Sequence, residues 1–98
     1  MSNPVLDFPW DKINVAATST AVAGPCHLHA ITFNGVTTGG TVVVYDGTDA
    51  GGTVIATYNI LGVSVSYQGI TFLYDCKMDV GVHVVFTNFV GNFTVTYK

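Results

Sequence analysis

The chain has 98 residues, a formal net charge of −3 and only 9% charged side chains, and its cations are three lysines with no arginine. So few cations argue against a surface for nucleic acid, because neutralising phosphates requires clustered Lys and Arg. The length limits the chain to one domain with a single core.

Hydrophobic residues make up 49% of the chain. The surface of an ordinary monomeric domain carries about 25–35% charged side chains, and this chain has too few to cover itself in that way. Part of its outer surface must therefore be apolar or rich in Thr, Ser, Asn and Gly. Such a surface is typical of a subunit that faces other proteins.

The first predicted element is an extended N-terminal arm over residues 1–12. Pro4 and Pro9 prevent a helix there, and Phe8 and Trp10 are the candidate anchors of the arm against its own domain or a neighbour. A frayed terminus is the alternative. The segment has no basic region before an apolar run, so we expect no signal peptide. No apolar stretch approaches the roughly 18 residues that cross a bilayer, which argues against a membrane protein.

From residue 13 onward the sequence predicts only strands. Residues rich in Val, Ile, Thr, Tyr and Phe alternate with clusters of Gly, Asn and Asp. The predicted strands are 13–18, 26–34, 40–46, 53–60, 63–68, 70–76, 79–87 and 91–98. Short strands at regular spacing predict an all-β fold, an antiparallel β-sandwich over residues 13–98 that is jelly-roll-like. The pattern does not give the strand order.

Two predicted strands have a period of two, which is the signature of a half-buried strand. In the last strand the outward residues are Thr and Asn. The expected inward faces are Val80, Val82, Val84 and Phe86 in one strand, and Phe93, Val95 and Tyr97 in the other.

His27 and His29 lie two residues apart on a predicted strand, so they point to the same face and are close enough to share a metal. His83 leaves its strand opposite Val82 and Val84, which makes a zinc site of three histidines conceivable. No further His or carboxylate follows at a metal-site spacing. We therefore expect no metal and interpret the three histidines as assembly or interface residues.

The sequence predicts no enzyme activity and no cofactor. Cys26 and His27 are adjacent on a strand, so they face opposite sides and cannot form a nucleophilic dyad. Ser64 and Ser66 have no His near them in the sequence. The segment 46–49 (Asp-Gly-Thr-Asp) lacks the acidic residue that closes a calcium loop and predicts a turn.

Cys26 and Cys76 would permit one disulfide. A free buried Cys behaves as a small hydrophobe, and in a protein made in the cytoplasm we expect both thiols to be free. A bridge between neighbouring strands stays open at this point.

Several segments resemble small β-sandwich proteins encoded in the genomes of tailed phages. An opening strand of the form G-x-L-H-x-I-x-x-N precedes a T-V-x-V-Y-D-G-T strand and turn, then G-T-x-I-A-T and a last strand like F-T-V-T-Y. The matching positions of the first three elements are Gly24, Leu28, His29, Ile31 and Asn34, then 41, 42 and 44–48, then 52, 53 and 55–57. The chain departs from the pattern at 79–81, Asp-Val-Gly, where such proteins commonly have Gly-Leu.

The resemblance, over about residues 13–98, implies a phage virion structural protein, namely a capsid decoration or cement protein. Such a protein is made in the bacterial cytoplasm and sits as a homotrimer on the outer capsid surface of the virion. There it binds the major capsid protein and stabilises junctions between capsomers. We expect the 1–12 arm and the Thr/Asn-rich sheet face to mediate this assembly.

The alternative function is a host-attachment or glycan-binding β-sandwich module of a phage fibre or head spike. In that case exposed aromatic rings would stack on sugars, although aromatics in strands belong more often to cores or interfaces. The candidate rings are Trp10, Tyr45, Tyr58, Tyr67, Tyr74 and Tyr97.

Overall fold

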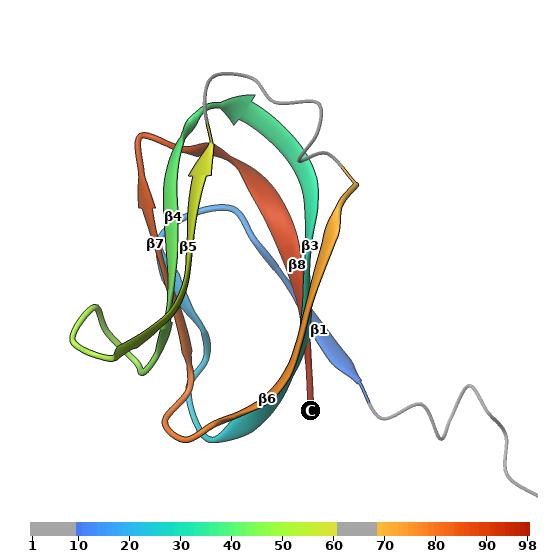
Figure 1. The fold of residues 1–98 in the computed structure, drawn as a ribbon, viewed down its shortest axis with the longest axis vertical. Coiled ribbons are helices and arrows are strands. Elements are labelled where there is room, and N and C mark those ends of the chain that lie inside the picture. Colours follow the sequence, from blue (N-terminus) through green and yellow to red (C-terminus); the bar gives the residue numbers. More distant parts are fainter. Residues whose placement is uncertain (1–9, 61–68) are drawn as a thin grey trace, which may run out of the picture.

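The computed structural model describes residues 10–60 and 69–98, and these residues form strands and no helix. The strands are β1 (Asp11–Val15), β2 (Ser19–Val22), β3 (Cys26–Thr38), β4 (Gly40–Asp46), β5 (Thr53–Ile60), β6 (Thr71–Met78), β7 (Val82–Thr87) and β8 (Val90–Tyr97). They make two antiparallel sheets, in the orders β1-β8-β3-β6 and β2-β7-β4-β5 (Figure 1). Eight strands in two sheets with this interleaved order form a jelly-roll sandwich, which confirms the predicted fold class. No membrane-spanning helix occurs in the described part of the chain.

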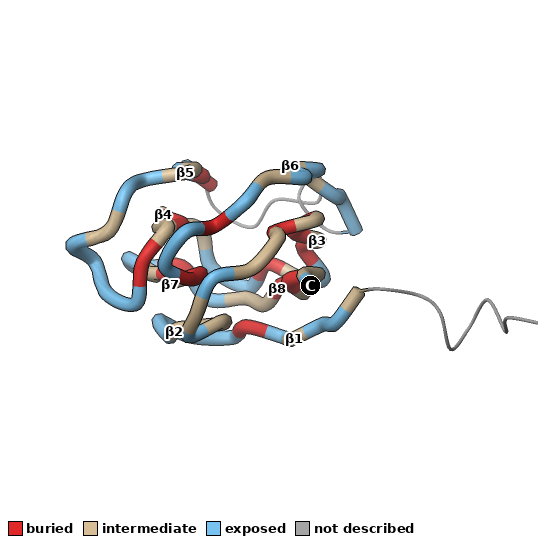
Figure 2. The backbone as a smooth tube through the Cα atoms, turned by 90° about the horizontal axis from the view of Figure 1, so that it is seen from below, coloured by how far each residue is buried: buried red, intermediate tan, exposed pale blue. Residues whose placement is uncertain are grey.

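The core lies between the two sheets, and Figure 2 shows buried residues on strands of both layers. Phe33 is fully buried at its centre. Its ring meets that of Tyr58 edge-on at 5.1 Å and that of Phe93 at 5.2 Å, measured between centroids. Aromatic pairs prefer such edge-to-face and tilted arrangements. The fully buried aliphatic partners include Leu28, Ile31, Val42, Val44, Val82, Val84 and Val95.

The predicted strand boundaries agree with the structure to different degrees. β4 and β5 have the predicted bounds, and β6 and β8 differ by no more than two residues at either end. β2 was not predicted, and the predicted strand 63–68 lies outside the described residues. The inward faces of Val82 and Val84 and of Phe93 and Val95 are confirmed.

Two expectations near strand ends are wrong. Val80 is not part of an inward face, because it lies in the turn before β7 and is 50% exposed. Asp11 and Lys12 are not part of an arm, because they belong to β1 and pair with Tyr97 and Thr96. The rest of the predicted arm, including Phe8, lies outside the described residues.

The turn between β6 and β7 is held by one carboxylate at the end of β4. Asp46 accepts hydrogen bonds from the backbone N–H groups of Val80 and Asp79, both 2.9 Å, and of Gly81, 3.3 Å. The bonds from Val80 and Asp79 are the main causes that lower the pKa of Asp46 below its ordinary value. Asp46 itself is the last residue of β4, and residues 47–49 lie in the turn that joins β4 to β5, where a turn was predicted.

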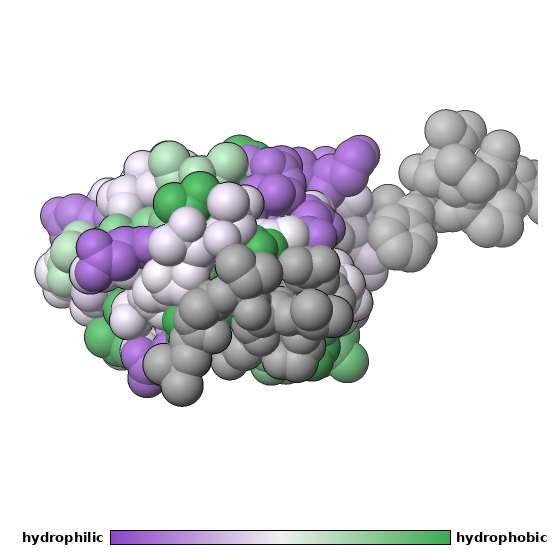
Figure 3. Space-filling model, turned by 90° about the horizontal axis from the view of Figure 1, so that it is seen from above, coloured by the Kyte–Doolittle hydropathy of each residue, from purple (hydrophilic) through white to green (hydrophobic). Residues whose placement is uncertain are grey.

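The described surface is partly apolar, as the composition predicts. On the end of the sandwich seen in Figure 3, hydrophobic and weakly polar residues lie between the hydrophilic ones. Large hydrophobic side chains that are at least 40% exposed are Val54, Ile70, Leu73, Val80 and Val90.

Candidate functional site

A bulge in the β1-β8-β3-β6 sheet places the residues of the candidate site. Leu28 pairs with Cys76 but Ala30 pairs with Leu73, so β6 has one extra residue opposite His29. The β3–β8 register shifts at the same place. Bulges re-aim side chains and are common beside functional sites.

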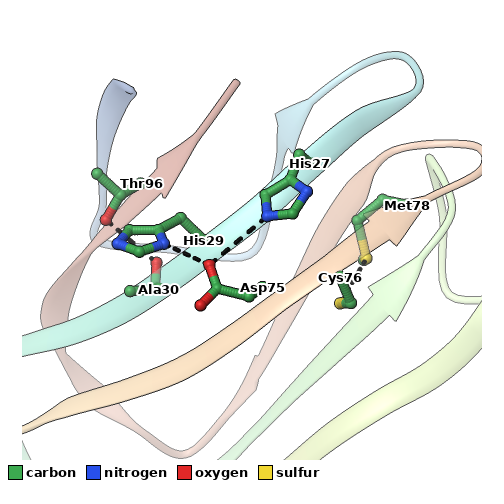
Figure 4. A network of polar contacts seen from close by, with 7 residues as sticks. All are labelled: His27, His29, Ala30, Asp75, Cys76, Met78 and Thr96. Atoms are coloured by element: carbon green, nitrogen blue, oxygen red, sulfur yellow. Dashed lines mark hydrogen bonds and ion pairs between the residues drawn. The ribbon is translucent and has the colours of Figure 1, made fainter. Parts of the chain in front are cut away.

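Asp75 lies in the bulged part of β6 and adopts a positive φ of 47°. Its Oδ1 is 2.5 Å from Nδ1 of His29 and 3.5 Å from Nε2 of His27 (Figure 4). The hydrogen bond from His29 is the largest cause that lowers the pKa of Asp75, and the bond from His27 adds to it. Since an ionised carboxylate only accepts hydrogen bonds, Nδ1 is the protonated nitrogen of His29 in this contact.

Trp10 covers the two imidazoles. Its ring stacks on that of His29, with centroids 4.1 Å apart and an interplanar angle of 11°, and it lies 5.4 Å from the ring of His27. Trp10 comes immediately before β1, so it reaches β3 across the end of β8. The structure therefore brings together three of the predicted interface residues, Trp10, His27 and His29.

All three lysines of the chain lie on the outer face of the same sheet. Lys77 pairs with His27 across β6 and β3, and Lys98 exchanges two backbone hydrogen bonds of 3.0 Å with His27. Lys12 pairs with Thr96 on β8. The alternate residues Ile13, Cys76 and Tyr97 pack against the core, and successive strand residues point to opposite faces. The lysine side chains therefore point outward.

We call this surface the Trp10 patch and define it by Trp10, Lys12, His27, His29, Asp75, Lys77 and Lys98. Its acidic neighbours are Asp75, which is shared by the two histidines, and Asp79, which is 3.5 Å from Lys77 in an exposed ion pair. The lysines are scattered in the sequence, so only the strand order reveals that they share one sheet face. The patch gathers every lysine and arginine charge of the chain in one place.

The rest of this outer face is polar but uncharged. Asn14 donates to Asn92 at 3.1 Å, Asn34 donates to Thr94 at 2.9 Å, and the hydroxyls of Thr32 and Thr71 are 2.8 Å apart. Between this ladder of Asn and Thr side chains and the Trp10 patch lies Leu73, which is 68% exposed. The outward Thr and Asn of the last strand are thus part of a broader Thr/Asn-rich sheet face.

The structure does not bring together the three histidines that a zinc site would need. His83 lies on β7 in the other sheet, where its Nδ1 is 2.9 Å from Oγ1 of Thr20. In the Trp10 patch, Asp75 bonds directly to His29, which leaves no room for an ion between them. No group of three or more His, Cys, Asp or Glu among residues 10–60 and 69–98 is arranged to hold a metal.

Cys26 and Cys76 are free. They lie on neighbouring strands but not opposite each other, since Cys26 pairs with Met78 and Cys76 pairs with Leu28. Both thiols pack against the core, and desolvation raises the pKa of each. Neither thiol has the environment of a nucleophile, because such thiols have lowered pKa values.

Most of the tyrosines proposed as sugar platforms are not exposed. Tyr58 is buried, its hydroxyl bonds to that of Tyr74, and Tyr74 and Tyr97 pack against the core. Burial also raises the pKa of Tyr74. Tyr45 lies beside His83 on the other sheet, and Tyr67 falls outside the described residues.

The described residues form no pocket, so the Trp10 patch is part of an open surface. The chain matches no protein-family model, and no curated protein or solved structure is significantly similar to it.

Proposed function

We propose that this protein is a structural protein of a tailed-phage virion, a capsid decoration protein that binds the outer shell of the head. The observation that supports this most is the Trp10 patch, where all the lysines of the chain share one sheet face with Trp10, and Asp75 and Asp79 are their acidic neighbours. The sequence resemblance supports the choice of a phage head as the partner. The protein acts by binding alone and stabilises junctions between capsomers.

The chemistry of the patch specifies the surface that it contacts. Lys12, Lys77 and Lys98 complement carboxylates, and complementary charge steers association and fixes the orientation of the partner. Trp10 and the exposed Leu73 bury apolar area against the shell, at about 25 cal/mol per Å² removed from water. The partner surface is therefore an acidic part of the major capsid protein with an apolar centre.

The N-terminal arm adds to this contact, because it joins the domain at Trp10 inside the patch. Deleting residues 1–9 tests the role of the arm in binding. Residues 11–15 are kept because they form strand β1. We expect the shortened protein to fold and to bind heads more weakly. Unchanged occupancy on heads would contradict a role of the arm.

The experiment that tests the function is the binding of the purified protein to phage heads that lack it, measured by co-sedimentation. We expect saturable binding that weakens as salt is added, because salt screens exposed charges. Lys12→Gln should weaken binding. Thr87→Glu is the matched control, because it lowers the net charge by the same amount on the exposed end of β7 in the other sheet. Absence of binding, or equal loss in both variants, would overturn the proposal.

A further inference from the structure

Four of the described strands lie at sheet edges, namely β1 and β6 in one sheet and β2 and β5 in the other (Figures 1 and 2). An edge strand presents unpaired backbone N–H and C=O groups, which can pair with another chain. Proteins protect such edges with charges, prolines, bulges or very short strands.

Three of the four edges carry such protection. β1 has five residues and begins with Asp11 and Lys12. β2 has four residues and its register shifts between Thr20 and Val22. β6 carries a bulge together with Asp75 and Lys77.

β5 is the least protected of the four edges. It has eight residues, Thr53–Ile60, with no charged residue and no proline. Its one irregularity lies near its start, opposite Val44 and Tyr45, and the stretch from Ala56 to Ile60 pairs with β4 without a shift. Among the described strands, β4 is the only one that pairs with it.

Among the described residues, the outer edge of β5 is the side of the strand that has no pairing strand. Tyr58 and Ile60 point into the core, where the hydroxyl of Tyr58 reaches Tyr74 of β6. Thr57 and Asn59 point outward and are exposed. In the described part of the chain, β5 is thus paired with β4 on one side and leaves its other edge free to accept a new strand.

We propose that β5 pairs antiparallel with β5 of a second copy of this chain, joining two four-stranded sheets into one continuous sheet. The occupant is a second copy because an antiparallel pair of identical strands satisfies a two-fold axis, with the same residues on both sides. Like charges directly opposite each other destabilise a strand pair, and β5 brings none to such a contact. Self-pairing of β1 or β6 would bring Lys12 or Lys77 near its own copy.

This inference goes beyond the proposed function and does not rest on it. A two-fold contact through β5 gives an even number of copies, whereas the resemblance to decoration proteins implies three. The mass of the protein in solution decides between these numbers, and binding to heads is a separate measurement.

The test is sedimentation of the full chain over a range of concentrations, with Thr57→Lys as the edge variant. The contact is symmetric, so the new charge is introduced twice, and we expect dimerisation to weaken by at least about tenfold. Added salt should restore part of the dimerisation of this variant, because salt screens the repulsion between the two new charges. Thr87→Lys, on the exposed end of β7 in the same sheet, is the matched control and should leave the dimer unchanged.

Circular dichroism checks that each variant folds, and Asn59→Lys replaces Thr57→Lys if that variant does not fold. A dimer that is lost in the edge variant alone supports the inference. A wild-type monomer or trimer, an edge variant that dimerises normally, or equal loss in the Thr87→Lys control would each overturn it.

Discussion

His29 and Asp75 are 46 residues apart in the sequence and are joined by a hydrogen bond of 2.5 Å between Nδ1 and Oδ1. The bond exists because a bulge in β6 gives Asp75 a positive φ and turns its carboxylate toward β3. One carboxylate thereby orients two imidazoles beneath Trp10. The geometry of the Trp10 patch depends on this contact.

Asp75→Asn should change how stability depends on pH. The folded pKa of Asp75 is lowered, mainly by the bond from His29. Its contribution is therefore complete above the unfolded pKa of about 3.9 and is lost as the pH falls through the folded pKa. The melting temperatures of wild type and variant should differ most above about pH 3.9, the unfolded pKa, and should converge as the pH falls below the folded pKa. Asp46 is present in both proteins, so its own titration cancels in the comparison. A difference that stays constant across the acid range would contradict the prediction.

Asp46→Ala should destabilise the fold by about 1–2 kcal/mol. It removes the acceptor of three backbone N–H groups in the β6–β7 turn, and bonds to a charged group contribute about 1.5–3 kcal/mol each when well shielded, less where water can replace them. Urea unfolding measures the change. Asp79→Ala is the control, since its exposed ion pair with Lys77 contributes at most about 1 kcal/mol. Equal effects of the two substitutions would show that Asp46 does not hold the turn.

Gly40→Ala should destabilise the fold by about 2 kcal/mol or more. A Cβ at this position would lie 2.3 Å from the carbonyl oxygen of Thr87 and 2.4 Å from the backbone nitrogen of Phe89, and such overpacking forces the backbone to shift. Gly24→Ala is the matched control. A Cβ there meets no atom within 4 Å, so the expected change is within about 0.5 kcal/mol. Chemical denaturation of both variants compares the two positions, and a tolerated Gly40→Ala would contradict the close approach.

Tyr58→Phe and Tyr74→Phe should each cost about 0.5–1.5 kcal/mol, because each removes one hydroxyl of the bond that links the two sheets. The double variant should cost clearly less than the sum, since the second substitution removes a partner that is already unpaired. Urea unfolding of the four proteins completes the cycle. Strict additivity would show that the two hydroxyls do not interact.

The parts of the fold that were predicted from the sequence have strong local signals. β4 and β5 are strands rich in β-branched residues, with Asp46-Gly47 and Gly51-Gly52 marking the turn between them. β2 was missed because Ser-Thr-Ala-Val is short and has no alternation. β3 continues past Asn34-Gly35, since that pair forms a register shift in the ladder with β8 and not a turn.

The candidate site was also predicted only in part, because local sequence signals do not show which strands pair. His27 and His29 are close in sequence, so their shared face follows from the period of a strand. Asp75 and the three lysines share the face of the histidines only through the pairing of β3 with β6 and β8 and of β8 with β1, and strand order cannot be derived from local pattern. His83 was considered with the other histidines because it leaves its strand opposite Val82 and Val84, but the topology places it in the other sheet.

The central claim is that the Trp10 patch is the surface by which the protein binds a phage head. An image reconstruction of heads carrying the bound protein tests it most directly. The account predicts density for the sandwich on the outer shell, with the β1-β8-β3-β6 sheet turned toward the capsid and Trp10 in the contact. A bound sandwich whose Trp10 patch faces solvent, or heads with no added density, would contradict it.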